Sequence, residues 1–130
     1  MTDCSVYFKS LVEQDNTAIV ICDLNHTIIY MNPASVLNYK KYGGTALLGK
    51  SLLACHNENS AVMIKKVVQW FSESVNNNCV HTAYNEKQNK DIYMIALRDD
   101  AKNLIGYYEK HEYRNKDTSP FYEIQSCNHR

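Results

Sequence analysis

Residues 18–31, AIVICDLNHTIIYM, decide the fold of this 130-residue chain. Two short runs rich in β-branched residues, at 18–22 and 27–31, have the composition of strands. Between them, Asp23 and Asn25 supply side-chain oxygens that favour a tight turn. The stretch therefore predicts an antiparallel hairpin.

The segment before the hairpin predicts a short helix at residues 6–12. Its apolar residues fit one helical face better than they alternate, and they are Val6, Phe8, Leu11 and Val12. Asn16-Thr17 ends this segment. We therefore divide the chain into an N-terminal helix at 1–15 and a domain that begins at residue 16.

The segment after the hairpin predicts several helices. Asn32-Pro33 marks the start of a short helix at 34–39, and residues 47–53 indicate a further helical turn. Asn59-Ser60 offers N-cap oxygens for a longer helix at 61–75. The apolar residues of this longer helix recur at helical spacing, and they are Met63, Ile64, Val67, Trp70, Phe71 and Val75.

The last third of the domain predicts an antiparallel meander of three strands, at 79–84, 91–98 and 104–113. Residues 115–130 form a polar tail, for which we expect only a weak contact through Phe121 and Tyr122. A hairpin, short helices, one longer helix and a meander predict an α+β domain with a five-stranded antiparallel sheet.

Composition excludes several function classes. The chain has 14 Lys and Arg against 14 Asp and Glu, so it lacks the basic excess of a general nucleic-acid binder. No stretch approaches the roughly 20 apolar residues that cross a bilayer, and the first residues lack the features of an export signal. Five cysteines at irregular spacing do not form a disulfide framework, so we expect a cytoplasmic protein.

The order of elements resembles that of a PAS domain over about residues 6–114. The residues that carry the likeness are Ile19-Val20-Ile21-Cys22-Asp23, Ile28-Ile29-Tyr30-Met31-Asn32-Pro33-Ala34, Leu48-Gly49-Lys50-Ser51 and Ile105-Gly106. The resemblance implies a sheet in the order 2-1-5-4-3, crossed by the long helix, over a domain at 16–114. No kinase, cyclase or DNA-binding segment follows, so we expect a stand-alone PAS protein or a part of a longer chain.

Residues 49–60, GKSLLACHNENS, resemble the Gly-Lys/Arg…Cys-His-Pro…Ser stretch of PAS modules joined to hemerythrin-like domains. The likeness continues through Ala96-Leu97-Arg98-Asp99 and Leu104-Ile105-Gly106. The chain departs from that pattern at Asn57, where the subgroup usually has Pro.

The resemblance implies a ligand cupped between the sheet and the long helix. A flavin is disfavoured, because residues 53–57 carry Cys55 but lack the Arg and Gln of flavin-binding PAS domains. Haem needs an axial ligand, most often a His nitrogen. We favour His56 for the haem iron over His81, with Trp70 and tyrosines available to a bound gas. Without haem, an apolar small molecule or no ligand remains.

Zinc binding and catalysis are weaker alternatives. Cys22 with His26, and Cys79 with His81, have spacings that two zinc ligands can adopt, but neither pair resembles a structural zinc unit. The adjacent pair Cys55-His56 is a poor nucleophile and base, since neighbours rarely direct their side chains at each other. We therefore expect no enzyme.

These observations favour a cytoplasmic sensory domain that binds a small molecule. The predicted pocket residues are His56, His81, Ile21, Met63, Val67, Trp70, Phe71, Ile95 and Leu97. We expect a homodimer through the N-terminal helix, a signalling protein partner, and no binding to nucleic acid or membrane. The alternative is a ligand-free module for protein–protein interaction or dimerisation.

Overall fold

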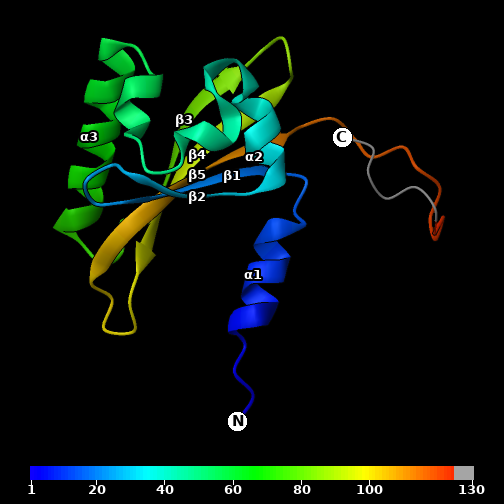
Figure 1. The fold of residues 1–130 in the computed structure, drawn as a ribbon, viewed down its shortest axis with the longest axis horizontal. Coiled ribbons are helices and arrows are strands. Elements are labelled where there is room, and N and C mark those ends of the chain that lie inside the picture. Colours follow the sequence, from blue (N-terminus) through cyan, green and yellow to red (C-terminus); the bar gives the residue numbers. More distant parts are fainter. Residues whose placement is uncertain (125–130) are drawn as a thin grey trace.

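The computed structural model describes residues 1–124, and within them it forms an α+β domain built on one antiparallel sheet (Figure 1). The strand order is β2-β1-β5-β4-β3, as predicted. In chain order the elements are α1 (Ser5–Glu13), β1 (Ala18–Asp23), β2 (Ile28–Met31), α2 (Pro33–Asn38), η1 (Lys40–Tyr42), η2 (Gly44–Leu47), η3 (Leu52–Cys55), α3 (Glu58–Glu73), β3 (Cys79–Asn85), β4 (Lys90–Arg98) and β5 (Leu104–Tyr113).

The hairpin of β1 and β2 forms as the turn residues predict. Asp23 Oδ1 accepts hydrogen bonds from the backbone N–H groups of Asn25 and Thr27, at 2.9 and 3.0 Å. Asn32 then caps α2, since its side chain accepts from Ser35 N at 3.0 Å. The same amide donates to Thr17 O at 2.8 Å, which ties the helix start to the beginning of β1.

The long helix begins earlier than predicted. Asn57, not Asn59 or Ser60, is its N-cap, because the Asn57 side chain accepts from Ser60 N at 2.8 Å. The helix also ends at Glu73 rather than residue 75, since Ser74 is extended. In place of one helical turn at 47–53, the chain forms the separate 3-10 turns η2 and η3.

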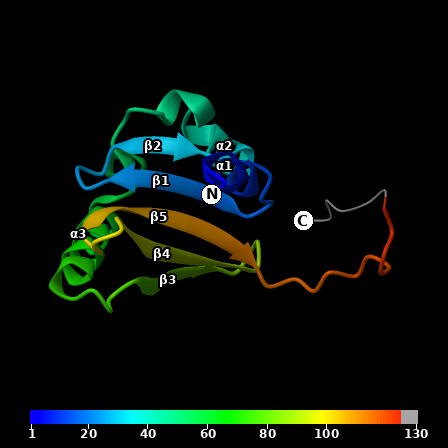
Figure 2. The same cartoon turned by 90° about the horizontal axis from the view of Figure 1, so that it is seen from below.

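The helices divide between the two faces of the sheet. α2, the 3-10 turns and α3 lie over one face, here called the inner face, whereas α1 projects from the other side (Figures 1 and 2). The apolar core lies between the inner face and these helices. Its fully buried members include Val20, Cys22, Ile28, Leu52, Phe71, Met94 and Tyr107.

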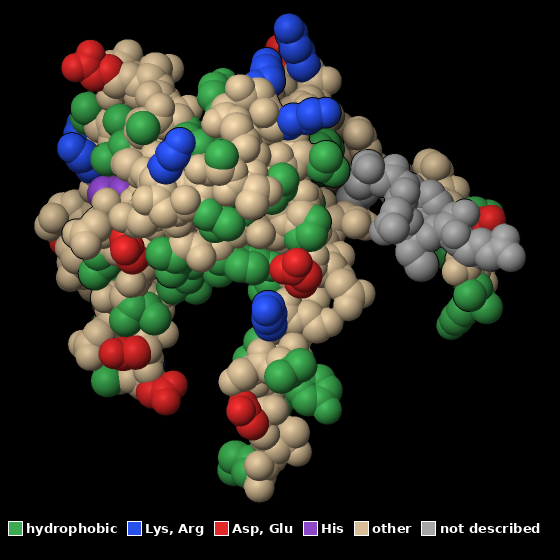
Figure 3. All heavy atoms as spheres, in the orientation of Figure 1, with side chains coloured by type: hydrophobic (Ala, Val, Ile, Leu, Met, Phe, Trp, Pro, Cys, Tyr) green, Lys and Arg blue, Asp and Glu red, His purple; other side chains and the backbone are tan. Residues whose placement is uncertain are grey.

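The register of β1, β5 and β4 places paired residues of these strands on the same face of the sheet. Val20 pairs with Glu109, which pairs with Met94, so these three side chains share the inner face. Ile21 pairs with Tyr108, which pairs with Ile95, so these share the outer face. Figure 3 shows hydrophobic side chains along this underside, between α1 and the β4–β5 turn.

The two ends of the described chain are exposed. α1 buries no residue, although Tyr30 and Asn32 bond to its last turn through Glu13 and Val12 O. The weak tail contact expected at Phe121 and Tyr122 was wrong, because both side chains are almost fully exposed. Residues 125–130 of the predicted tail lie outside the described residues. Over residues 1–124, no helix has the length and apolarity to cross a membrane.

Candidate functional site

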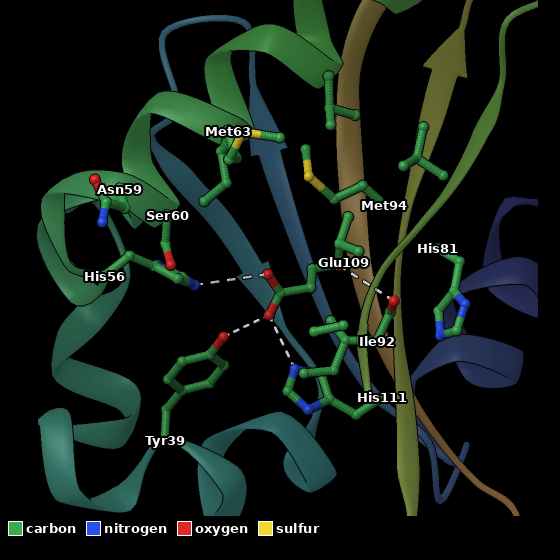
Figure 4. A pocket seen from close by; sticks show the side chains of 15 residues that line it. Tyr39, His56, Asn59, Ser60, Met63, His81, Ile92, Met94, Glu109 and His111 are labelled. Atoms are coloured by element: carbon green, nitrogen blue, oxygen red, sulfur yellow. Dashed lines mark hydrogen bonds and ion pairs between the residues drawn. The ribbon is translucent and has the colours of Figure 1, made fainter. Parts of the chain in front are cut away.

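A cavity of about 470 Å³ lies between α3 and the inner face of the sheet (Figure 4). Its walls come from α3 on one side and from β3, β4 and β5 on the other. Its lining residues are Tyr39, His56, Asn59, Ser60, Met63, Ile64, Val67, Val80, His81, Thr82, Ala83, Ile92, Met94, Glu109 and His111.

One end of the cavity is apolar. Met63, Ile64 and Val67 come from successive turns of α3, so helical spacing brings them to one face. Ile92 and Met94 come from alternate positions of β4, which point to the same side of a strand. This end can hold a hydrocarbon or aromatic group.

The other end is a polar group centred on the buried Glu109 (Figure 4). The Tyr39 hydroxyl donates to Glu109 Oε1 at 2.5 Å, and His111 Nε2 donates to the same oxygen at 2.9 Å. His111 Nδ1 is buried without a hydrogen-bond partner among residues 1–124. Glu109 is therefore the side chain that fixes the orientation of the His111 ring.

His56 completes the polar end from the helical side. It follows η3 directly, and its Nδ1 lies 2.9 Å from the Leu52 carbonyl oxygen. Its Nε2 lies 3.8 Å from Glu109 Oε2, which is longer than a hydrogen bond. The ring is thus held by the backbone, with Nε2 directed at the carboxylate.

The pKa of Glu109 is set by opposing effects. Burial raises the pKa, but the hydrogen bond and charge of His111, the Tyr39 hydrogen bond and the charge of His56 together bring it below the ordinary value. The carboxylate is therefore ionised at neutral pH. The same burial and the nearby Glu109 raise the pKa of Tyr39, so Tyr39 stays a donor.

His81 has a different environment from His56. It borders the cavity, but Figure 4 shows its ring turned away from it. The ring stacks on Tyr93 of β4 with centroids 4.9 Å apart, and Nε2 lies 2.7 Å from Asp91 Oδ1. His81 is therefore an outer-face residue, and its ring does not face a ligand in the cavity.

Of the nine predicted pocket residues, the structure brings four to the cavity lining: His56, His81, Met63 and Val67. The others lie elsewhere. Ile21, Ile95 and Leu97 belong to the outer face, because they pair with Tyr108 or Gly106 of β5. Phe71 is fully buried in the core, and Trp70 lies 40% exposed on α3. Whether any of the nine binds a cofactor stays a prediction.

Sequence reasoning missed Glu109, His111 and Tyr39, which make up most of the polar end. A signal was present in β5, since charged residues rarely lie inside a central strand without partners. Period-two alternation also places Glu109 and His111 on the same face as the buried Tyr107.

The polar end as arranged does not fit haem. His56 offers a nitrogen to the cavity, as an axial ligand must. However, Glu109 Oε2 lies 3.8 Å from that nitrogen, in the space that an iron and its porphyrin ring would have to occupy. An ionised carboxylate held by Tyr39 and His111 is not the apolar slot that a porphyrin needs. Residues 1–124 also contain no group of three or more side chains arranged to hold a metal ion.

Comparisons with known proteins bear on the fold. No family model and no curated protein matches the chain. Among solved structures, it is similar to a PAS domain from Colwellia psychrerythraea at 16% identity and a TM-score of 0.65, over 85% of this chain and 97% of that one. It is also similar to the PAS domain of Bordetella pertussis BvgS at 14% identity and a TM-score of 0.58, over 88% and 89%.

A third similar structure is that of the Aer2 receptor from Vibrio cholerae, described as a dual PAS-heme oxygen sensor. It is 15% identical with a TM-score of 0.51, over 76% of this chain and 95% of that one. Identities this low establish a shared fold. The chain therefore has the PAS fold, which occurs in sensory and signalling proteins. The likeness to hemerythrin-associated PAS modules stays a prediction.

Proposed function

We propose that this chain is a sensory PAS domain that binds a small molecule in the cavity between α3 and the sheet. The observation that carries the proposal is a 470 Å³ cavity with an apolar wall and a buried carboxylate group at one end. Small-molecule sites have this composition, with a few fixed polar groups in an apolar cavity. Occupancy would act through different ligand affinities of two packing states.

Sensing is favoured over catalysis. The Cys55 thiol is not a cavity-lining residue, and burial raises its pKa, so the thiol stays protonated. His56 directs one nitrogen to Leu52 O and the other toward Glu109, so neither is committed to Cys55. The described cysteines are free thiols, which agrees with the cytoplasmic location that we propose.

A ligand-free interaction module is the second candidate. Val6, Phe8 and Leu11 are exposed on α1, although such residues usually pack against another surface. We propose that α1 mediates a homodimer or contacts a signalling partner.

The test of the proposed function uses a variant that blocks the cavity. Met63 lines the cavity and is itself partly exposed, so Met63→Trp adds bulk there without overpacking the core. Val62→Trp is the matched control, since Val62 is the exposed neighbour that does not line the cavity. Mass spectrometry of organic extracts compares the purified wild type with both variants.

We expect a compound in the wild-type and Val62→Trp extracts that Met63→Trp lacks. Equal extracts from all three proteins would favour the ligand-free module. A visible spectrum after addition of hemin tests the haem alternative. A Soret band that disappears in His56→Ala would support that alternative, and it would require Glu109 to move away from His56.

A further inference from the structure

Two acceptor atoms face each other at the polar end of the cavity. His56 Nδ1 lies 2.9 Å from Leu52 O, and a carbonyl oxygen only accepts. Nδ1 therefore carries a ring proton, and in the neutral form of the ring Nε2 presents its lone pair to the cavity. The protein thus orients one acceptor, from the end of η3, toward Glu109.

The second acceptor is Glu109 Oε2. Both protein donors to this carboxylate, the Tyr39 hydroxyl and His111 Nε2, bind Oε1. No donor from residues 1–124 forms a hydrogen bond to Oε2, and His56 Nε2 stands 3.8 Å from it. Glu109 is only 5% exposed, so this ionised oxygen keeps its hydrogen-bonding capacity in a largely desolvated place.

The charged residues of the cavity lining disfavour a ligand with a negatively charged head. The lining contains one carboxylate and no Lys or Arg. The nearby buried Lys90 binds Asn38 Oδ1 at 2.8 Å and does not line the cavity. An anionic head would meet the Glu109 charge with no Lys or Arg of the lining to offset it, because the charges of His111, His56 and Lys90 already act on Glu109 itself. A cationic head would be attracted by the Glu109 carboxylate, and no Lys or Arg of the lining would repel it.

We propose that the cavity binds an amphipathic amine, with an N–H-bearing, positively charged head between Glu109 Oε2 and His56 Nε2. One hydrogen is donated to the carboxylate and one to the imidazole lone pair, while the apolar body lies against Met63, Val67 and Met94. This inference rests on the proposed function, because it names the ligand class of the same cavity. A charge-assisted hydrogen bond to Glu109 gives such an amine its preference over a neutral analogue.

The test measures binding of three probes of similar size and different head groups by calorimetry. The probes are phenethylamine, phenethyl alcohol and hydrocinnamate. We expect the wild type to bind the amine about fivefold more tightly than the alcohol, with the carboxylate weakest, since hydrogen bonds to charged groups exceed neutral ones by about 1 kcal/mol, which is roughly fivefold. Equal or tighter binding of the alcohol or the carboxylate would overturn the inference.

Variants of Glu109 and His56 test whether these two side chains cause the preference for the amine over the alcohol. Glu109→Gln should lose at least tenfold in amine affinity and little in alcohol affinity, whereas Glu112→Gln, on the same strand but exposed, should change neither. Should Glu109→Gln fail to fold, His56→Phe removes the second acceptor and should reduce the ratio of amine to alcohol affinity. An unchanged ratio in His56→Phe or in folded Glu109→Gln contradicts the inference.

The failure of the inference differs from failure of the proposed function. Binding of none of the three probes overturns the amine site. The proposed function fails as well only when the Met63→Trp extract also equals that of the wild type. An extracted compound without an amine head would retain the sensor and reject the amine.

Discussion

The two faces of the sheet each carry a histidine–carboxylate pair. The pairs differ in exposure to solvent and in whether a carboxylate oxygen lacks a hydrogen-bond donor. On the inner face, Glu109 is paired with His111, and both side chains are almost fully buried. On the outer face, Asp91 is paired with His81, whose side chain is 47% exposed. The same chemistry therefore occurs once under α3 and once beside solvent.

Both oxygens of the outer carboxylate accept hydrogen bonds, whereas only one oxygen of the inner carboxylate does. Asp91 accepts two hydrogen bonds from Arg114, at 2.7 and 2.8 Å, and faces His81 at 2.7 Å. Glu109 takes both of its hydrogen bonds on one oxygen. Residue type alone therefore does not identify a ligand site. The deciding features are that both members of the inner pair are buried and that Glu109 keeps an unused acceptor.

The largest expected effect comes from removing the buried carboxylate. Glu109→Ala leaves the Tyr39 hydroxyl and His111 Nε2 without their partner, so the free energy of unfolding should fall by about 3 to 5 kcal/mol. Urea unfolding measures this loss. Asp91→Ala is the outer-face control, and its loss should be smaller because His81 and Arg114 then reach water. A loss for Asp91→Ala as large as that for Glu109→Ala would remove the distinction between the faces.

A smaller effect is expected from removing one hydroxyl. Tyr39→Phe deletes one donor to Glu109 and keeps the ring, so stability should fall by about 2 kcal/mol. Tyr93→Phe is the matched control on the outer face, since Tyr93 contributes its ring to His81 and Lys110. We expect its thermal unfolding to stay near that of the wild type. Equal shifts for both tyrosines would contradict the role given to the buried hydroxyl.

Acid should weaken the inner pair in a definite pH range. The pKa of Glu109 is lowered in the folded state from its ordinary value of 4.5. Its contribution to stability is therefore fully present above about pH 4.5 and is lost as the pH falls through the lower folded value. Unfolding measured across acid pH should show a steeper decline for the wild type than for Glu109→Gln.

The outer pair separates from the inner one by its response to salt. The hydrogen bonds from Arg114 lower the pKa of Asp91, which gives acid sensitivity of the same sign. Because Arg114 and His81 are exposed, added salt should reduce the contribution of Asp91 to the free energy of unfolding, measured as the difference between the wild type and Asp91→Asn. The contribution of Glu109, measured in the same way with Glu109→Gln, should persist in high salt. Equal salt sensitivity of the Asp91 and Glu109 contributions would show that the two histidine–carboxylate pairs do not differ in exposure to solvent.

The smallest effect on folding is expected at α1. Phe8 is 65% exposed and α1 buries no residue, so Phe8→Ser with Leu11→Ser should change monomer stability by less than about 0.5 kcal/mol. The proposed homodimer should dissociate in the same variant. Sedimentation measures this, and an unchanged sedimentation coefficient would contradict the role of α1 in dimerisation.

The fold could be predicted because its signals are local. The turn at Asp23 and Asn25, the cap at Asn32 and the spacing of apolar residues in α3 each act within a few residues. The start of α3 was displaced because Asn57, Asn59 and Ser60 are all good N-cap residues, and only hydrogen-bond geometry distinguishes them.

The site could be predicted only in part, because the face of a strand depends on register. Ile19, Val20, Ile21 and Cys22 form one apolar run, so composition does not reveal that Val20 and Cys22 face inward. His56 was found through its motif-like position. Glu109, which His56 faces, lies on β5, 53 residues away in the sequence (109 − 56), and only the tertiary fold brings them together.

The most direct test of the central claim reads the proton positions of His56 in the wild-type protein. A long-range proton–nitrogen NMR spectrum, recorded before and after addition of phenethylamine, compares His56 with His81 on the outer face. We expect a proton on His56 Nδ1, an unprotonated Nε2 whose signal moves when the amine binds, and an unchanged His81. A His56 Nε2 that already carries a proton and ignores the amine would contradict it.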